Sequence, residues 1–436
     1  MSNGLVSSYF LEIFKHSNKI YIGYSGGLDS TVLLYALNQV PSLKKKLCAV
    51  HVHHGLSVNA NHWVEHCQLF CKAHSIPLIT KKVQFDRSCN IEENARKARY
   101  ECFSSLLKKE DALVLAHHQD DQAETLLLNL FRGAGVDGLA AMAPVQTFSI
   151  GKLIRPFLDL SRSTLEKYAA ENTLNWIDDP SNQDPRFARN FLRQTIIPQL
   201  KIQWPALSES LSRTAMHCQE AKLNLEELAR VDCPDLKNRK ETLSLVDLSQ
   251  LSESRLKNVL RTWLKNNQIK LRSADLLQRI IEQVIFSEKD SQACVQWNDI
   301  AIRRFQDTLY SIKGKEEPFQ NMAWKNFPRP IQVGNKKLSG KKAQSGLFVP
   351  PYSHLEVRFR EQGERFIWHG QTKSLKKLFQ EWKVPPWLRN TIPLLYINNQ
   401  LAAVVGWAIS DPFFRPNPPY TYALEFESTD PDCLET

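Results

Sequence analysis

The sequence predicts an α/β fold with a doubly wound parallel sheet at its amino-terminal end, followed by a mainly helical region and a small α+β unit. Residues 1–200 alternate short apolar runs with longer helical patterns, which is typical of βαβ units. The four strand candidates are 20–24, 47–52, 78–83 and 113–116, and the helical stretches between or after them are 30–39, 59–74, 91–108 and 122–131.

The pattern becomes helical after residue 205. Leu256, Val259, Leu260, Trp263 and Leu264 form an apolar stripe at helical spacing, and residues 295–310 are predicted to form a hairpin with Asn298 and Asp299 at its turn. Residues 313–346 contain several prolines and glycines, which predicts a linker with some local structure.

The last region is predicted to be a separate unit with strands at 355–360 and 394–406 and a helix between them. Asn398 and Asn399 would fold the second strand back on itself. We therefore expect three domains, at residues 1–204, 205–346 and 347–436.

Composition limits the class of protein. The formal charge of +10 favours an anionic partner such as nucleic acid. The nine cysteines are scattered and contain no CxxC pair, so we expect reduced thiols in a cytoplasmic protein. A signal peptide and a run of roughly 18 apolar residues are both missing, so no membrane association is predicted.

The most informative motif is SGGLDS, which stands between a predicted strand and a predicted helix. Its glycines allow the backbone to approach a phosphate, and the helix start directs N–H groups at it. Ser25, Gly26, Gly27, Leu28, Asp29 and Ser30 are therefore assigned to nucleotide binding. Asp29 would repel a phosphate unless a cation lay between them, which makes Asp29 the candidate Mg²⁺ ligand.

SGGLDS resembles the PP-loop of the N-type ATP pyrophosphatases, which cut ATP between its α and β phosphates. Four further blocks, HVHHGLSVNANHWVEHC, IEENARKARY, LAHHQDDQAETLLLNLFRGAGVDGLAAM and NWIDDPSNQDPRFARNFLR, resemble the tRNA(Ile)-lysidine synthetases. GERF and LKKLFQEWKVPPWLRNTIPLLY are similar to the carboxyl-terminal domain of the long bacterial form. The resemblance is weakest at residues 225–350.

The resemblance implies a reaction and its partners. ATP with Mg²⁺ would adenylate the wobble cytidine in the CAU anticodon of tRNA(Ile), and the ε-amine of free L-lysine would then displace AMP. The product, lysidine, would change codon reading from AUG to AUA, and the carboxyl-terminal domain would bind the tRNA. The sequence leaves the oligomeric state open, with a homodimer as one candidate.

The resemblance also assigns residues around the nucleotide loop. Asp121 and Glu124 match acidic positions of the family and share a helix face at i, i+3, where a carboxylate can orient an ammonium group or accept its proton. We assign catalytic roles to Asp29, Asp121 and Arg99. Substrate binding is assigned to His118, Glu124, Arg96, Arg132, Arg189 and Arg193.

Purely structural roles remain open alternatives for several of these residues. Asp121 and Glu124 could merely complement a helix dipole, and Arg96 and Arg99 could form a solvated helix face. Arg132 belongs to a Gly-rich stretch that could be an ordinary loop.

Other functions are disfavoured. A zinc site at His51, His53, His54, His117 and His118 has no CxxC beside it. A sulfur-transferring PP-loop enzyme would also need paired cysteines, and a glutamine-dependent amidotransferase would need a glutaminase domain. A non-catalytic RNA-binding protein that keeps ATP as a structural ligand is a further alternative.

Overall fold

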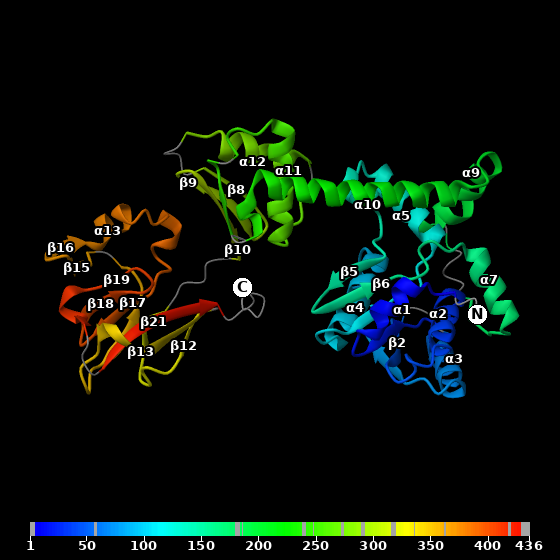
Figure 1. Cartoon of the computed structure of the whole chain (residues 1–436), viewed down its shortest axis with the longest axis horizontal. Coiled ribbons are helices and arrows are strands. Elements are labelled where there is room, and N and C mark those ends of the chain that lie inside the picture. Colours follow the sequence, from blue (N-terminus) through cyan, green and yellow to red (C-terminus); the bar gives the residue numbers. More distant parts are fainter. Residues whose placement is uncertain are drawn as a thin grey trace. The chain divides into compact units, whose positions relative to one another are not determined.

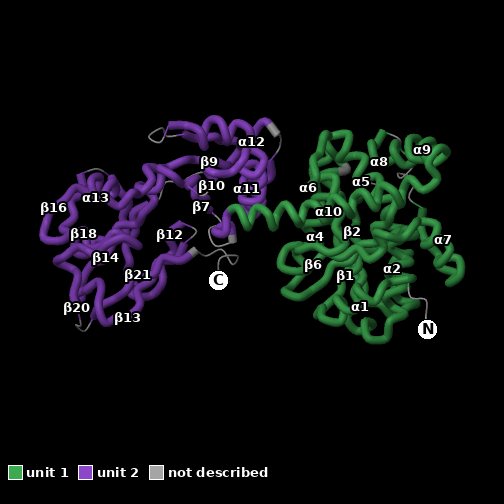
Figure 2. The backbone as a smooth tube through the Cα atoms, turned by 45° about the horizontal axis from the view of Figure 1, so that its top comes forward, with its two compact units in different colours: residues 1–232 green, residues 233–436 purple. Residues whose placement is uncertain are grey.

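The chain folds into two compact units, residues 1–232 and 233–436 (Figure 2). The structure, a computed structural model, describes residues 5–55, 59–178, 184, 186–237, 241–246, 248–271, 274–288, 293–314, 320–334, 336–361, 363–416 and 420–428. Parts of two motifs, residues 56–58 and residues 179–183 with 185, lie outside the described residues. No described helix is long and apolar enough to cross a membrane.

The first unit alternates strands and helices in the predicted order, and it ends in a long helix (Figure 1). Its strands are β1 (Ile20–Gly23), β2 (Leu47–His53), β3 (Leu78–Lys82), β4 (Ala112–Val114), β5 (Val145–Phe148) and β6 (Gly151–Ile154). Its helices are α1 (Ser8–Lys15), α2 (Leu28–Asn38), α3 (Ala60–Ala73), α4 (Ile91–Leu106), α5 (Gln119–Phe131), α6 (Val136–Leu139), α7 (Arg162–Glu171), α8 (Ala188–Phe191), the π-helical turn η2 (Leu192–Ile196), α9 (Ile197–Gln203) and α10 (Leu207–Asp232).

The six strands form one sheet in the order β3-β2-β1-β4-β6-β5. All neighbouring pairs are parallel except β5 and β6, which form an antiparallel hairpin at the edge. The strand order reverses direction at β1 and β4, and in sheets of this kind ligands bind beyond the carboxyl ends of the strands at that point. The predicted doubly wound parallel sheet is confirmed.

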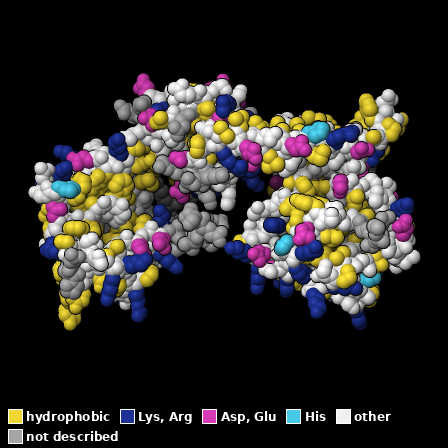
Figure 3. All heavy atoms as spheres, in the orientation of Figure 1, with side chains coloured by type: hydrophobic (Ala, Val, Ile, Leu, Met, Phe, Trp, Pro, Cys, Tyr) yellow, Lys and Arg dark blue, Asp and Glu magenta, His cyan; other side chains and the backbone are white. Residues whose placement is uncertain are grey.

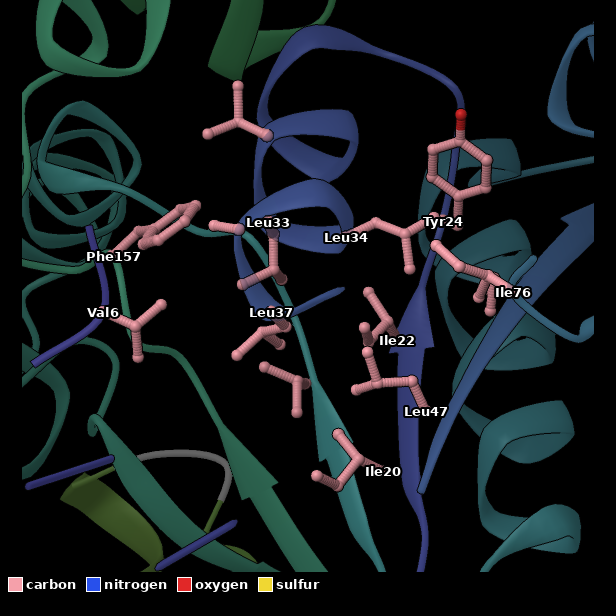
Figure 4. Packing of buried hydrophobic residues seen from close by; sticks show 14 of the residues in the cluster. Val6, Ile20, Ile22, Tyr24, Leu33, Leu34, Leu37, Leu47, Ile76 and Phe157 are labelled. Carbon is pink, nitrogen blue, oxygen red and sulfur yellow. The ribbon is translucent and has the colours of Figure 1, made fainter. Parts of the chain in front are cut away.

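Alternating residues of β1 explain why the sheet is covered on both faces. Ile20, Ile22 and Tyr24 pack with helix α2 in one buried cluster (Figure 4). Tyr21 instead joins Phe103 of α4 in a cluster on the opposite face. Because successive strand side chains point to opposite faces, an apolar run such as that of β1 requires helices on both sides.

The second unit begins with the 3₁₀ turn η3 (Pro234–Lys237) and combines helices with antiparallel sheets. Its first part holds α11 (Glu253–Asn266), α12 (Ala274–Ile280) and the π-helical turn η4 (Ile281–Ile285) beside a sheet of order β7-β10-β9-β8. Those strands are β7 (Thr242–Ser244), β8 (Cys294–Trp297), β9 (Ile300–Phe305) and β10 (Thr308–Lys313). The predicted apolar stripe is buried on α11, and the predicted turn at Asn298 joins β8 to β9.

The remaining strands of this unit form three further sheets. They are β11 (Met322–Ala323), β12 (Ile331–Val333), β13 (Lys336–Phe348), β14 (Leu355–Arg358), β15 (Arg365–Trp368), β16 (Gln371–Ser374), β17 (Leu394–Ile397), β18 (Gln400–Val404), β19 (Ala408–Ile409), β20 (Phe414–Pro416) and β21 (Thr421–Ser428). Helix α13 (Leu375–Glu381) and the 3₁₀ turns η5 (Pro386–Leu388) and η6 (Asp411–Phe413) complete the unit. The turn at Asn398 and Asn399 joins β17 to β18, as predicted, and both residues have positive φ.

The predicted linker at 313–346 differs from the structure. Most of β13 lies in this stretch, where it pairs with β12 on one side and β21 on the other. Leu338 is fully buried although lysines stand on both sides of it in the sequence. Pairing with strands up to about 90 residues away overrides the local composition, which is why the sequence pattern did not reveal the strand. Residues 315–319 and 335 lie outside the described residues.

The domain boundaries at 204/205 and 346/347 stay predictions. The structure adds two observations that bear on them. Helix α10 packs on α5 and α6 and belongs to the first unit up to Asp232. The position 346/347 falls inside β13.

Candidate active site

The candidate active site lies where β1 and β4, adjacent parallel strands, reach their carboxyl ends. The chain leaves β1 through the glycine loop and enters α2 at Leu28, and it leaves β4 through residues 115–118 and enters α5 at Gln119. Two helix starts and two loops therefore converge at one edge of the sheet, as expected for a nucleotide site in this fold.

The glycine loop is held by its own hydroxyl groups. Ser25 Oγ lies 3.0 Å from Ser30 Oγ and accepts a hydrogen bond from the Gly27 N–H at 3.2 Å. The Gly26 carbonyl accepts from the Ile177 N–H at 2.9 Å. Gly26 has a φ of 85°, and a Cβ there would lie 3.1 Å from Cys67 Sγ, so the position favours glycine on both counts.

Asp29 stands in the first turn of α2, beside this loop. Its side chain is 31% exposed, yet Oδ1 is buried and has no hydrogen-bond partner among the described residues. Burial raises the pKa of Asp29 above its ordinary value, with the charge of Asp121 adding to the effect. A carboxylate oxygen left unsatisfied at a helix start fits a cation held jointly with phosphate oxygens.

His118 connects the two loops. As the N-cap of α5, its Nδ1 accepts the Asp120 N–H at 3.2 Å, so the proton of a neutral ring is on Nε2. That Nε2 lies 3.7 Å from Asp29 Oδ2 and 3.4 Å from Asp121 Oδ2. Asp121 also accepts the His118 backbone N–H at 3.1 Å, which completes a capping box.

Two arginines bind the acidic face of α5. Glu124, whose side chain is fully buried, accepts Arg189 Nε at 2.8 Å and Arg193 Nε at 2.6 Å. Arg193 also reaches Asp121 Oδ1 at 3.1 Å. Burial alone would raise the pKa of Asp121, but its interactions with His118, His117 and the two arginines lower the pKa to about 2. The predicted residues Asp29, His118, Asp121, Glu124, Arg189 and Arg193 thus lie in one continuous network.

A pocket of about 510 Å³ adjoins this network. His118, Glu124 and Arg193 contribute to its wall, together with residues from the start of α7 and from α9 and α10. Asp120 lies in the same wall and binds Lys201 at 3.0 Å and Ser208 at 2.6 Å. The glycine loop itself does not line the pocket.

Arg96 and Arg99 lie on α4 and form a second basic group. Their guanidinium groups stand 5.1 and 6.0 Å from the ring centre of Tyr100. The charge of Arg99 helps to lower the pKa of both His54 and His117, so it acts at the carboxyl edge of the sheet. Arg132 is not brought to the site, because it caps the opposite end of α5 from Asp121.

The histidines considered for zinc do not gather as ligands. His51 Nδ1 donates to the Tyr24 carbonyl at 3.0 Å and lies 3.5 Å from Cys67 Sγ. In the described part of the chain, no group of three or more His, Cys, Asp or Glu side chains is arranged to hold a metal ion. A cation at Asp29 would therefore depend on phosphate and water oxygens for its remaining ligands.

Several site residues escaped the sequence analysis. Lys201 and Ser208 bind Asp120 from 81 and 88 residues away, and Arg155 contacts His117 from the end of β6. The sequence gives only a weak signal for Arg155, because no more than two apolar residues, Leu153 and Ile154, precede it. Lys201 and Ser208 stand in a helical, polar stretch that carries no such signal.

A parallel sheet whose first strand enters a Ser-Gly-Gly loop and a helix defines the PP-loop class of ATP-using domains, and a family model described as the PP-loop domain matches residues 5–200. Models described as the TilS substrate binding domain and the TilS substrate C-terminal domain match residues 243–310 and 355–422.

Curated relatives extend the match over most of the chain. The tRNA(Ile)-lysidine synthase of Legionella pneumophila (strain Lens) is 50% identical over 96% of this chain and 98% of its own length. The enzyme of the same name from Escherichia coli O157:H7 is 38% identical over 89% and 92%, and that of Coxiella burnetii (strain RSA 493 / Nine Mile phase I) is 37% identical over 93% and 92%. The chain belongs to the tRNA(Ile)-lysidine synthase family.

Proposed function

We propose that this enzyme uses ATP and Mg²⁺ to adenylate the wobble cytidine of tRNA(Ile) with a CAU anticodon, and then joins free L-lysine to the activated carbon. AMP and pyrophosphate leave, and the product lysidine changes codon reading from AUG to AUA. The observation that carries the proposal is the convergence of the glycine loop and the acid–histidine–arginine network on His118.

The glycine loop supports the first step. The start of α2 offers backbone N–H groups and a positive dipole to the phosphates of ATP. Asp29, with its unsatisfied Oδ1, would hold Mg²⁺ against the same phosphates. When bound, the ion neutralises phosphate charge and so favours attack by an oxygen of the base on the α phosphorus.

The acidic network supports the second step. An efficient general base has a pKa near the working pH, and the pKa of Asp121 is about 2. The negative charge of Asp121 is therefore suited to hold and orient the lysine ammonium group. As a base, Asp121 is too weak to remove the ammonium proton efficiently. Glu124 is enclosed by Arg189 and Arg193, so we assign it to positioning those arginines.

The remaining basic residues are proposed to bind tRNA. Arg96 and Arg99 lie on α4, where the charge of Arg99 acts on His54 and His117, and Arg132 caps the end of α5. The second unit would bind the tRNA body through its exposed lysines. We further propose a cytoplasmic location, supported by thiols that are not joined in disulfides, such as those of Cys67, Cys71 and Cys89, and a homodimer, which light scattering would test.

One assay tests the whole proposal. The protein is incubated with ATP, Mg²⁺, isotope-labelled lysine and total tRNA, and the tRNA is then digested to nucleosides. We expect a labelled nucleoside with the mass of lysidine, formed only when ATP is present and accompanied by AMP and pyrophosphate. ATP-dependent incorporation of sulfur in place of lysine, or stable RNA binding without AMP release, would reject the proposal.

A further inference from the structure

Arg155 is a buried arginine whose partners are all neutral. It follows β6, next to the end of β4, and only 4% of the residue is exposed. Its NH1 group donates to the Ala143 carbonyl at 2.7 Å and to Gln146 Oε1 at 3.2 Å, and its Nε donates to His117 Nδ1 at 3.3 Å. No ion pair joins it to a carboxylate within the described residues. Burying a charge without a counter-charge is costly, so the position calls for an explanation.

The contact with His117 fixes the chemical state of the imidazole. A guanidinium group has donors and no acceptor, so His117 Nδ1 must be unprotonated. The proton of the neutral ring is then on Nε2, across the ring from Arg155. The pKa of His117 is lowered to about 3, mainly by burial; the charge of Asp121 opposes this shift, and the charges of Arg155, Arg189 and Arg99 add to it. His117 is therefore a neutral Nε2–H donor throughout the physiological range.

The neighbouring His118 has the same tautomer as His117, but the surroundings of its Nε2–H group differ. Both imidazoles accept at Nδ1, but His118 directs its Nε2–H toward the carboxylates of Asp29 and Asp121. His117 stands in a different field, because its surroundings include three guanidinium groups and one carboxylate. Such a field favours an anionic acceptor for the Nε2–H group over a neutral carbonyl.

We propose that Arg155 is a positioning residue that locks His117 as a neutral Nε2–H donor to a phosphate oxygen of the reacting nucleotide. The inference rests on the proposed function for the identity of that nucleotide. A donor fixed in advance needs no reorganisation when charge develops on the phosphate, which is the source of its effect on rate. Arg155 itself does not touch the reacting atoms and acts through His117.

The first experiment measures the tautomer and needs no turnover. The protein is labelled with ¹⁵N-histidine, and the His117 signals are assigned by comparison with His117→Gln. In the wild type we expect an unprotonated Nδ1 and a protonated Nε2 from pH 5.5 to 8. In Arg155→Met, which keeps the length of the side chain but removes its donors, we expect mixed tautomers. An Nδ1–H tautomer in the wild type, or an unchanged tautomer in the variant, overturns the proposal.

The second experiment measures turnover. We expect kcat for lysidine formation to fall about tenfold to a hundredfold in Arg155→Met and to acquire a new dependence on pH below 7. His117→Gln should retain more activity than His117→Phe, because the amide still offers an N–H donor. Arg230→Met, which removes an exposed guanidinium from the end of α10, is the matched control and should keep wild-type kcat.

The two experiments separate the possible failures. If the wild type makes no lysidine while the tautomer measurement gives the expected result, the proposed function fails and the Arg155–His117 arrangement stands. If Arg155→Met does not fold, Arg155→Lys takes its place, since a lysine still has a donor but loses the contacts of the second guanidinium nitrogen. Wild-type kcat in a folded Arg155→Met variant overturns the proposal, and so does an Arg155→Lys variant that keeps the His117 tautomer but loses kcat, because Arg155 would then act by another route than His117.

Discussion

The edge of the parallel sheet and the surface of the second unit both carry many basic side chains, but these side chains differ in burial and in their pairing with carboxylates. At the sheet edge, Arg189 and Arg193 are largely buried and bind carboxylates at 2.6 to 3.1 Å. In the second unit, Lys336, Lys337, Lys341 and Lys342 are all exposed along β13, and Figure 3 shows Lys and Arg side chains projecting there.

This difference separates two uses of positive charge. Buried guanidinium groups that share carboxylates have fixed positions, so they can hold reacting groups in place. Exposed lysines keep their mobility and counterions, so they add affinity for a polyanion without fixing geometry. This difference supports the proposed division, in which the sheet edge carries the chemistry and the second unit binds tRNA. Each prediction below would break or sharpen that division.

The largest effect is expected for Asp29→Asn. A neutral amide is a poor Mg²⁺ ligand, so turnover should fall by about a hundredfold to a thousandfold or more. Because burial raises the pKa of Asp29, ionisation of this residue costs stability, and the variant should unfold at the same or a higher temperature. The measurements are kcat with saturating ATP and a thermal unfolding curve. Wild-type turnover would remove Asp29 from the site.

Glu124→Gln tests the buried pairing. Removing the charge leaves Arg189 and Arg193 short of a counter-charge, so the free energy of unfolding should fall by about 3 kcal/mol. Glu166→Gln is the matched control, because Glu166 forms an exposed i, i+4 pair with Arg162 and should cost less than about 0.5 kcal/mol. Denaturant unfolding measures both. Equal losses in the two variants would show that burial does not distinguish these pairs.

The pH dependence of stability sharpens the same point. The folded pKa of Asp121 is about 2, below its ordinary value of 3.8, so its contribution is fully present above pH 4 and is lost as the pH falls toward 2. The contribution is about 2 kcal/mol. The free energy of unfolding of the wild type should therefore fall more steeply between pH 4 and 2 than that of Asp121→Asn. Parallel curves would contradict the lowered pKa.

A smaller effect is expected on tRNA binding. Lys376, Lys377 and Lys383 are exposed on and after α13, and changing all three to Gln should weaken tRNA binding about tenfold. The log–log salt slope should become shallower by roughly 0.7 to 0.9 per lost contact. ATP affinity should not change. This variant is a cleaner test than deletion from residue 347, because that deletion would cut through β13.

Its control is a second triple substitution that removes the same charge. Lys44, Lys45 and Lys72 are exposed in the first unit, and Lys44 and Lys45 precede β2, at the edge of the sheet opposite the candidate active site. Their change to Gln should leave tRNA affinity within about twofold. If both triples weakened binding equally, total charge and not the second unit would determine affinity.

The sequence predicted those parts of the fold and site in which local pattern and function coincide. SGGLDS had to follow a strand and open a helix for its glycines to be useful, and it does so at β1 and α2. The i, i+3 spacing of Asp121 and Glu124 placed them on one face of α5, where the structure also has them.

The remainder depends on contacts between distant segments. Strand β13 is stabilised by β21, and Asp120 is held by Lys201 and Ser208, but neither partner can be read from the residues nearby. The state of His117 likewise depends on an arginine 38 residues away. The periodicity of apolar residues indicates which face of a segment must be buried. It does not indicate which other segment packs against that face.

The smallest effect is expected for substitutions of the cysteines. An unchanged kcat in those variants would argue against sulfur transfer. Cys67 is fully buried beside the glycine loop, 3.5 Å from His51 Nδ1, which would be a plausible position for a reactive thiol. Burial, however, raises the pKa of Cys67 and of Cys71 to about 12, and a nucleophilic thiol needs a lowered pKa because the thiolate is the reacting form. Both side chains therefore act as small apolar residues of the core.

Cys67→Ala and Cys71→Ala should each cost about 1 kcal/mol of stability and leave kcat for lysidine formation within about twofold of the wild type. Cys89, which is exposed, gives a matched control, since Cys89→Ala should change neither quantity. Thermal unfolding and the labelled-lysine assay measure the two effects separately. A folded Cys67→Ala variant that kept wild-type ATP affinity but had lost activity would give this thiol a chemical role and reopen the sulfur-transfer alternative.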